Sequence, residues 1–263
     1  MFFSRPKIDG PPTVQPGEPV IAFLLLAQPE FPVADAVEKL RALPFATNMS
    51  DTSAEDGTVA FYLGDETVGI SSVGTPYPDS LEFPYNSSWM FPDAATALSN
   101  HAGFVTIALT GGAGDPAQRR ATLTRLTAAL AHEAGVIGIY WPDAVAVIRP
   151  DVFIQMTERT LTDKVFPAYL WLNMQVWNNN DGTNSLATTG LNKFGRYEIE
   201  VINVMVKPSG LREFVYGAAH TLILDNPPIK DGMEVARFGS SILRASLKPS
   251  VWEGRGTVIR MQT

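Results

Sequence analysis

Two carboxylates separated by one residue, Glu198 and Glu200, have the types and spacing that could most directly do chemistry. Alternate side chains of a β-strand point to the same face, so a strand here would bring both carboxylates together and permit acid/base catalysis or cation binding. Arg196 and His220 could complete such a group. Alternation with apolar residues such as Ile199 is equally typical of a strand face exposed to solvent, and we favour that interpretation.

The segment around these carboxylates could form a recognition surface. An aromatic run ends at Trp177, the strong turn signal Asn180-Asp181-Gly182 follows, and Gly190 and Gly195 suit positive-φ positions. A polar loop on a stiff aromatic base can recognise a partner, although a structural corner that shapes a surface is the favoured interpretation. The candidate binding residues are Trp177, Asn179, Asp181, Lys193, Arg196, Glu198 and Glu200.

A glycine-rich segment has the spacing of a cofactor-binding loop. Gly112, Gly114 and Ala117 match a G-x-G-x-x-A pattern between an expected strand and an expected helix. A phosphate at this helix start would meet the negative charge of Asp115, and Pro116 removes one backbone donor. The sequence therefore predicts a capped helix start rather than a nucleotide site, and no cofactor.

Other catalytic and metal-binding motifs are absent from the sequence. His132-Glu133 lacks the second histidine that a zinc-protease helix needs one turn later. Neither a serine-hydrolase elbow nor a P-loop occurs, and without cysteine there is no disulfide, thiolate zinc site or cysteine nucleophile. We therefore predict no catalytic residues and no metal site.

One pattern in the C-terminal half resembles a known family. Thr188, Gly190-Leu191, Phe194-Gly195 and Glu198 resemble the T-x-G-L-x-x-F-G-x-x-E core of a bacterial family with a C-terminal domain of unknown function. The arrangement is similar to suppressor-of-fused-type domains, some of which are associated with immunity proteins of bacterial toxin systems. The resemblance implies a cytoplasmic bacterial protein that binds and blocks a toxin, with no catalytic residues to transfer.

The charge distribution favours a basic protein partner. Residues 1–100 contain 13 Asp and Glu against 4 Lys and Arg. Such an acidic field repels nucleic acid and anionic lipid and suits a basic partner, although a solubilising surface is the favoured interpretation. The apolar run at 20–27 is too short to span a bilayer and predicts a buried strand, so we expect neither a nucleic-acid partner nor a membrane.

The elements that must position these residues form an α+β protein with two mixed halves. Residues 1–18 are predicted as an extended arm, 19–149 as a ferredoxin-like half and 150–263 as a C-terminal α+β half. The first half is expected to have a β-α-β-β-α-β core with an added helix and strand at 115–134 and 136–141. The six core elements are expected at 20–27, 33–44, 58–63, 67–70, 92–98 and 104–109, with a polar connection at 47–57.

The second half is expected to begin with a helix at 150–161 that could join the halves. Its remaining elements are predicted as strands at 168–177, 196–206 and 255–262 and a helix at 209–224.

Absent catalytic motifs, acidic charge and the family resemblance together favour a protein-binding module, specifically a cytoplasmic immunity protein that blocks a basic bacterial toxin domain. The alternative is an enzyme of unrecognised type with a polar site between the two halves, because clefts between domains often hold ligands.

Overall fold

The computed structural model describes residues 9–55, 57–161, 165–252 and 254–263, which fold into two compact units. Gln15–Trp171 form the N-terminal unit, and Leu172–Thr263 form the C-terminal unit together with the described residues that precede Gln15. The helix expected at 150–161 is present and belongs to the N-terminal unit. The chain therefore passes from one unit to the other after Trp171 rather than near residue 150.

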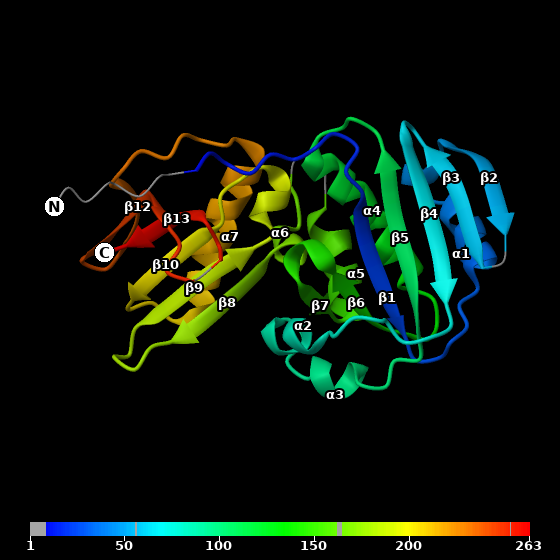
Figure 1. Cartoon of the computed structure of the whole chain (residues 1–263), viewed down its shortest axis with the longest axis horizontal. Helices are drawn as coiled ribbons and strands as arrows, with labels where there is room; N and C mark the ends of the chain where they lie inside the picture. Colours follow the sequence, from blue (N-terminus) through cyan, green and yellow to red (C-terminus); the bar gives the residue numbers. More distant parts are fainter. Residues whose placement is uncertain (1–8, 56, 162–164, 253) are drawn as a thin grey trace. The chain divides into compact units, whose positions relative to one another are not determined.

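The described part of the N-terminal unit contains one sheet of seven strands, in the order β2-β3-β4-β5-β1-β6-β7 (Figure 1). All neighbouring strands are antiparallel. The strands are β1 (Val20–Leu26), β2 (Met49–Glu55), β3 (Thr58–Leu63), β4 (Glu66–Val73), β5 (Gly103–Gly111), β6 (Val136–Trp141) and β7 (Ala146–Ile148). The helices are α1 (Val33–Arg41), α2 (Glu82–Ser87), α3 (Ala94–Leu98), α4 (Pro116–Leu130), α5 (Pro150–Thr160) and α6 (Ala168–Trp171).

Hydrophobic periodicity located most of these elements correctly, but β2, α2 and β7 were missed, and α6 lies at 168–171, where a strand was expected. The polar stretch at 47–57 was expected as a connection, and the structure forms β2 there. β2 lies at the sheet edge and pairs only with β3, so backbone pairing makes a strand without an apolar face. The short helix α2, inside the proline-rich stretch before α3, was also not predicted.

The strands at 20–109 do not form the ferredoxin-like order expected for them. That order would place β4 directly beside β1, whereas β5 lies between them and pairs with both. The coarser prediction of an α+β fold with two mixed parts is confirmed.

One face of this sheet is sealed by helices. Side chains on alternate positions, such as Leu24, Val68 and Ile107, are fully buried, and α1 and α4 pack over the strands that carry them. The intervening positions are mostly half-exposed, as the burial patterns of β1, β4 and β5 show. Because side chains of a strand alternate between its two faces, one face of the sheet forms the core and the other remains partly exposed.

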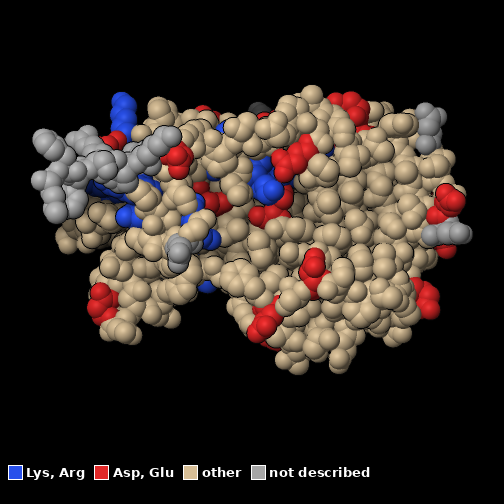
Figure 2. Space-filling model, viewed as in Figure 1, with Lys and Arg blue, Asp and Glu red and all other residues tan. Residues whose placement is uncertain are grey.

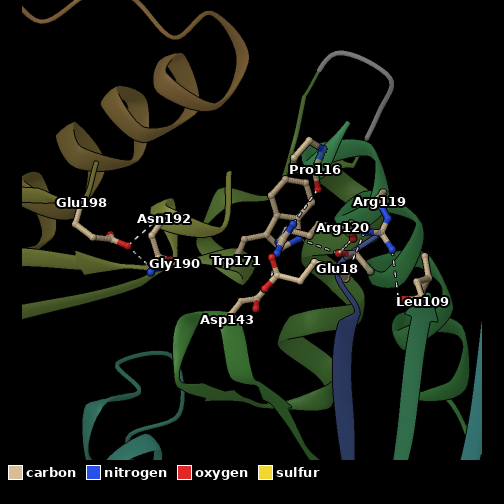
Figure 3. A network of polar contacts seen from close by, with 11 residues as sticks. Glu18, Leu109, Pro116, Arg119, Arg120, Asp143, Trp171, Gly190, Asn192 and Glu198 are labelled. Atoms are coloured by element: carbon tan, nitrogen blue, oxygen red, sulfur yellow. Dashed lines mark hydrogen bonds and ion pairs between the residues drawn. The ribbon is translucent and has the colours of Figure 1, made fainter. Parts of the chain in front are cut away.

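A buried ion pair attaches α4 to the sheet. The Arg119 guanidinium donates to both carboxylate oxygens of Glu66, at 2.6 and 3.0 Å, and the two residues are 6% and 7% exposed. Arg119 also donates to the backbone oxygens of Glu18, at 2.6 Å, and Leu109, at 3.3 Å (Figure 3). One side chain therefore joins α4 to β4, to β5 and to the residues just before β1.

The glycine-rich segment before α4 leaves space for the Glu66 carboxylate of this ion pair. Gly112 has φ +61°, and a Cβ there would lie 2.7 Å from the Glu66 carboxyl carbon. Asp115 caps α4 by accepting from the backbone N–H groups of Ala117, at 2.9 Å, and Gln118, at 3.1 Å. The predicted capped helix start is confirmed, and glycine is needed because Glu66 lies so close to the backbone.

The opposite face is covered at one end only. There α2, α3 and the segment before them pack on Leu25, Phe104 and Val147. Phe23 and Tyr140 stack at 5.9 Å beside this cluster, and Tyr77 contacts both rings edge-on. Burial raises the pKa of the Tyr77 and Tyr140 hydroxyls.

The described part of the C-terminal unit contains a mixed six-stranded sheet in the order β11-β12-β13-β10-β9-β8. β10 and β13 are parallel, and the other neighbours are antiparallel. The strands are β8 (Asn173–Asn178), β9 (Asn184–Thr189), β10 (Ile199–Val204), β11 (Met233–Phe238), β12 (Ser241–Pro249) and β13 (Thr257–Gln262), and the helix is α7 (Pro208–Leu224). The sequence predicted β8, β10, β13 and α7 but not β9, β11 or β12.

Part of the predicted arm packs on this unit. The Asp9 N–H donates to Thr257 Oγ1 at 3.1 Å, and Tyr197 Oη donates to the Asp9 carbonyl at 2.9 Å. The predicted arm is therefore attached to the C-terminal unit at Asp9, and residues 1–8 lie outside the described part of the chain.

We predict that Arg119→Met destabilises the protein by about 3–5 kcal/mol, because it leaves the Glu66 carboxylate buried without its partner. The free energy of unfolding is measured by urea denaturation. Arg149→Ala is the control, since its pair with Asp151 is exposed and should contribute less than about 1 kcal/mol. Equal losses in the two variants would show that the Glu66–Arg119 pair does not hold α4 in place.

Candidate interaction surfaces

The T-x-G-L pattern and Glu198 form one hydrogen-bonded corner in the C-terminal unit. Glu198 Oε1 accepts from the backbone N–H groups of Gly190, at 2.9 Å, and Asn192, at 3.1 Å (Figure 3). Its Oε2 accepts from the Thr188 hydroxyl at 2.6 Å, and Thr188 Oγ1 accepts from the Ile199 N–H at 2.8 Å. The Glu198 carboxylate therefore fixes the end of β9 to the start of β10.

Arg196 and Gly195 complete the structural part of this corner. Arg196 Nε donates to the Leu222 carbonyl at 2.6 Å, at the C-terminal end of α7, where carbonyls lack helical partners. Gly190 and Gly195 have φ +122° and +68°, so the prediction of positive φ is confirmed at both. Lys193 lies between them in the 3-10 turn Leu191–Phe194 and is half-exposed.

The turn between β8 and β9 holds two of the candidate residues. Asn179 Nδ2 donates to Thr183, Ser185 and Asn203, at 2.9 to 3.0 Å. Asp181 accepts from the Thr183 hydroxyl, at 2.6 Å, and from its N–H, at 2.9 Å, and these hydrogen bonds lower the pKa of the Asp181 carboxyl. Both side chains serve the turn.

Glu200 was expected on a solvated strand face, and that expectation is wrong. Its side chain is 0% exposed, because the segment after β12 folds over it. The Glu200 carboxylate accepts from the Ser250 hydroxyl and from the Val251 N–H, at 3.2 Å, and Arg260 Nη2 lies at 3.6 Å. The residues that bury Glu200 follow it by about 50 positions, so no local pattern could have predicted its burial.

The structure does not gather the seven candidate residues into one site. The turn with Asn179 and Asp181 lies at one end of β9 and the Glu198 corner at the other, and six strand residues at about 3.3 Å each span roughly 20 Å. Trp177 stacks on Trp252 with ring centroids 4.7 Å apart, and Trp252 was not predicted. The aromatic character of Trp252 was its only signal in the sequence.

The proposed catalytic group is likewise dispersed. Arg196, Glu198 and Glu200 make separate sets of hydrogen bonds. His220 lies on α7, and its ring is 6.1 Å from that of Tyr216. These side chains have structural roles, which weakens the enzyme interpretation.

An exposed surface that the sequence analysis did not single out lies on the open face of the N-terminal sheet. Strand register places its side chains in three rows across β3, β4 and β5, of which two continue to β1 and one of these to β6. No row contains a charged residue. The rows are Tyr62-Thr67-Thr110, Ala60-Gly69-Ala108-Ile21 and Thr58-Ser71-Thr106-Phe23-Tyr140.

These rows form a flat, uncharged surface, hereafter the open sheet face. Tyr62 is 49% exposed, and a Cβ on Gly69 would meet nothing within 4 Å. Figure 2 shows the surface over these strands as uncharged, with acidic side chains around its margins. In the sequence, alternate positions of the predicted strands at 58–63, 67–70 and 104–109 are already uncharged. Only the sheet order shows that these strands lie side by side and form one surface.

Among the residues that the structure describes, no group of three or more histidines or carboxylates is placed to hold a metal ion. No helix in the described ranges is long and apolar enough to cross a membrane.

Comparisons with known proteins identify no relative of this chain. No family model, no curated protein and no solved structure matches it.

We predict that Glu198→Ala destabilises the C-terminal unit by about 2–3 kcal/mol, because two backbone N–H groups and the Thr188 hydroxyl lose their charged acceptor. Glu213→Ala removes an exposed carboxylate from α7 and should change stability by no more than about 0.5 kcal/mol. Chemical denaturation of both variants provides the measurement. If Glu198→Ala matches its control, the corner does not depend on this carboxylate.

We also predict that Glu200→Gln destabilises by about 1–3 kcal/mol, since Arg260 loses its buried counterion. Gly195→Val should be at least as damaging, because a β-branched residue at φ +68° is strained and its Cβ would lie 3.3 Å from the Pro12 carbonyl. Both are measured by denaturant unfolding. A neutral Glu200→Gln would mean that Glu200 is solvated in solution.

Proposed function

We propose that this chain is a protein-binding module that recognises a basic protein partner through the open sheet face. The carrying observation is that a four-stranded exposed face without charge lies within a strongly acidic unit. The cores of protein interfaces are depleted in charged residues, so an exposed face without charge fits a protein interaction site.

The charge of the N-terminal unit supports a basic partner. Residues 15–171 contain 18 Asp and Glu against 8 Lys and Arg, a net charge of −10. Several of the basic side chains are already paired internally, including Arg119 with Glu66 and Arg120 with Asp143. The remaining acidic excess attracts a basic protein, accelerates its association and disfavours nucleic acid.

The composition of the open sheet face supports a protein rather than a small substrate. Ala60, Gly69 and Ala108 lie side by side in register and leave the backbone accessible, and the Phe23–Tyr140 pair borders them. Aromatic residues are enriched at protein interfaces, and the small residues beside this pair leave room for side chains of a partner. A small molecule would instead be expected to bind in a concave site.

The resemblance of Thr188, Gly190-Leu191, Phe194-Gly195 and Glu198 to immunity-associated domains extends this proposal to a cytoplasmic immunity protein that blocks a basic toxin domain. The corner that these residues form is structural, so it is consistent with a shared fold and supplies no catalytic group.

We also propose a ferredoxin-like core for the N-terminal unit, built from other elements than the sequence indicated. The supporting observation is the antiparallel order β4-β5-β1-β6, with α1 following β1 and α4 following β5. These elements can be read as a split β-α-β pattern to which β2, β3 and β7 are added.

The test captures proteins from a lysate of the native cell on the immobilised wild type and on Ala108→Arg, at about 50 mM and about 500 mM salt. We expect a basic protein on the wild type at low salt, less of it at high salt, and at least tenfold weaker binding to Ala108→Arg once that protein is purified. The reason is that an arginine at the centre of the open sheet face both protrudes and repels a basic surface.

Ala34→Arg is the matched control, because it adds the same charge at an exposed position of α1, on the covered side of the sheet. It should retain most of the binding. Capture that is equal on wild type and Ala108→Arg, or that is insensitive to salt, would contradict the proposal.

A further inference from the structure

An apolar groove in the C-terminal unit lies between α7 and the strands β11 and β13. Its volume is about 660 Å³, within the range of about 300–1,000 Å³ that is typical of small-molecule sites. Leu222, Ile259 and Met261 are buried among its lining residues. The remaining apolar lining residues include Phe214, Ala218, Pro227, Ile229, Met233 and Val235.

α7 contributes to this lining a glycine, Gly217, which has no side chain to narrow the groove. A Cβ added to Gly217 would meet nothing within 4 Å, and Gly217 lines the groove with an ordinary helical backbone. Glycine in a helix interior costs about 1 kcal/mol relative to alanine, and no close approach of backbone requires it here. Met233 and Met261 add flexible side chains that adapt to an apolar occupant.

The charged residues of the lining indicate which charge a ligand of the groove would carry. The lining contains two charged side chains, Glu213 and Glu234. Arg237 neutralises Glu234 through hydrogen bonds of 2.5 and 3.1 Å. Glu213 is exposed, and within the described ranges its carboxylate has no hydrogen bond or ion pair. The groove therefore offers an apolar interior and one available negative charge.

We propose that this groove binds a small amphipathic amine, with its alkyl chain along the apolar lining and its ammonium group at Glu213. No lysine or arginine is among the lining residues to bind an anionic head, and Arg237, which contacts the lining residue Glu234, is held by that carboxylate. The Thr221 hydroxyl donates to the Gly217 carbonyl at 3.1 Å, so its donor is satisfied without a polar group of the ligand. This site is independent of the open sheet face.

The experiment titrates the full chain with decylamine and with decanoate, each below its micelle concentration, by isothermal titration calorimetry. The two probes have chains of similar length and opposite charge. We expect one decylamine per chain and binding of decanoate at least about fivefold weaker, the scale of one exposed charge contact. Glu213→Gln should bring the two affinities close together.

Gly217→Leu should weaken decylamine binding at least tenfold, because the leucine occupies the groove. Its melting temperature should equal or exceed that of the wild type, since leucine favours a helix more than glycine does. Ser209→Leu is the control, because it adds the same side chain at an exposed position of α7 outside the groove lining. Unchanged decylamine affinity in Gly217→Leu, or equal affinity of the wild type for both probes, would overturn the proposal.

Discussion

The structure of the N-terminal unit depends on the buried guanidinium of Arg119. Arg119 has its charge balanced by Glu66 and its remaining donors satisfied by backbone carbonyls, so α4 lies in one position over the sheet. Burying an ion pair costs desolvation free energy, and this one is tolerated because its hydrogen bonds are nearly complete. The positive-φ glycine Gly112 is part of the same arrangement, since any side chain there would displace the Glu66 carboxylate.

In the C-terminal unit, carboxylates rather than a guanidinium hold separate segments together. Glu198 satisfies the backbone of a sharp corner, and Glu200 is covered by the segment after β12 and balanced by Arg260. Two acidic residues that could have served catalysis thereby hold the chain in shape. Their roles differ because Glu198 binds the loop beside it, whereas Glu200 meets residues from a distant hairpin.

A role in binding agrees with how the two units distribute charge and apolar surface. The acidic unit presents an uncharged sheet face, and the other unit keeps an apolar groove beside one available carboxylate. Helices cover one side of the N-terminal sheet and only part of the other, and the exposed part of that other side is uncharged. That exposed face, rather than any group of reactive side chains, supports the proposed function.

The sequence by itself determined the α+β class, the helices α1, α4 and α7, and the strands β1, β3, β4, β5, β6, β8, β10 and β13, because their periodicity and caps are local. It also predicted positive φ at Gly190 and Gly195 from residue type alone. Only the tertiary structure decided that β5 separates β4 from β1, that polar residues at 49–55 form a strand, and that Glu200 is buried. Each of these three features depends on contacts with residues far away in the sequence. A local pattern does not specify which distant segment supplies a hydrogen bond to a strand or covers a carboxylate.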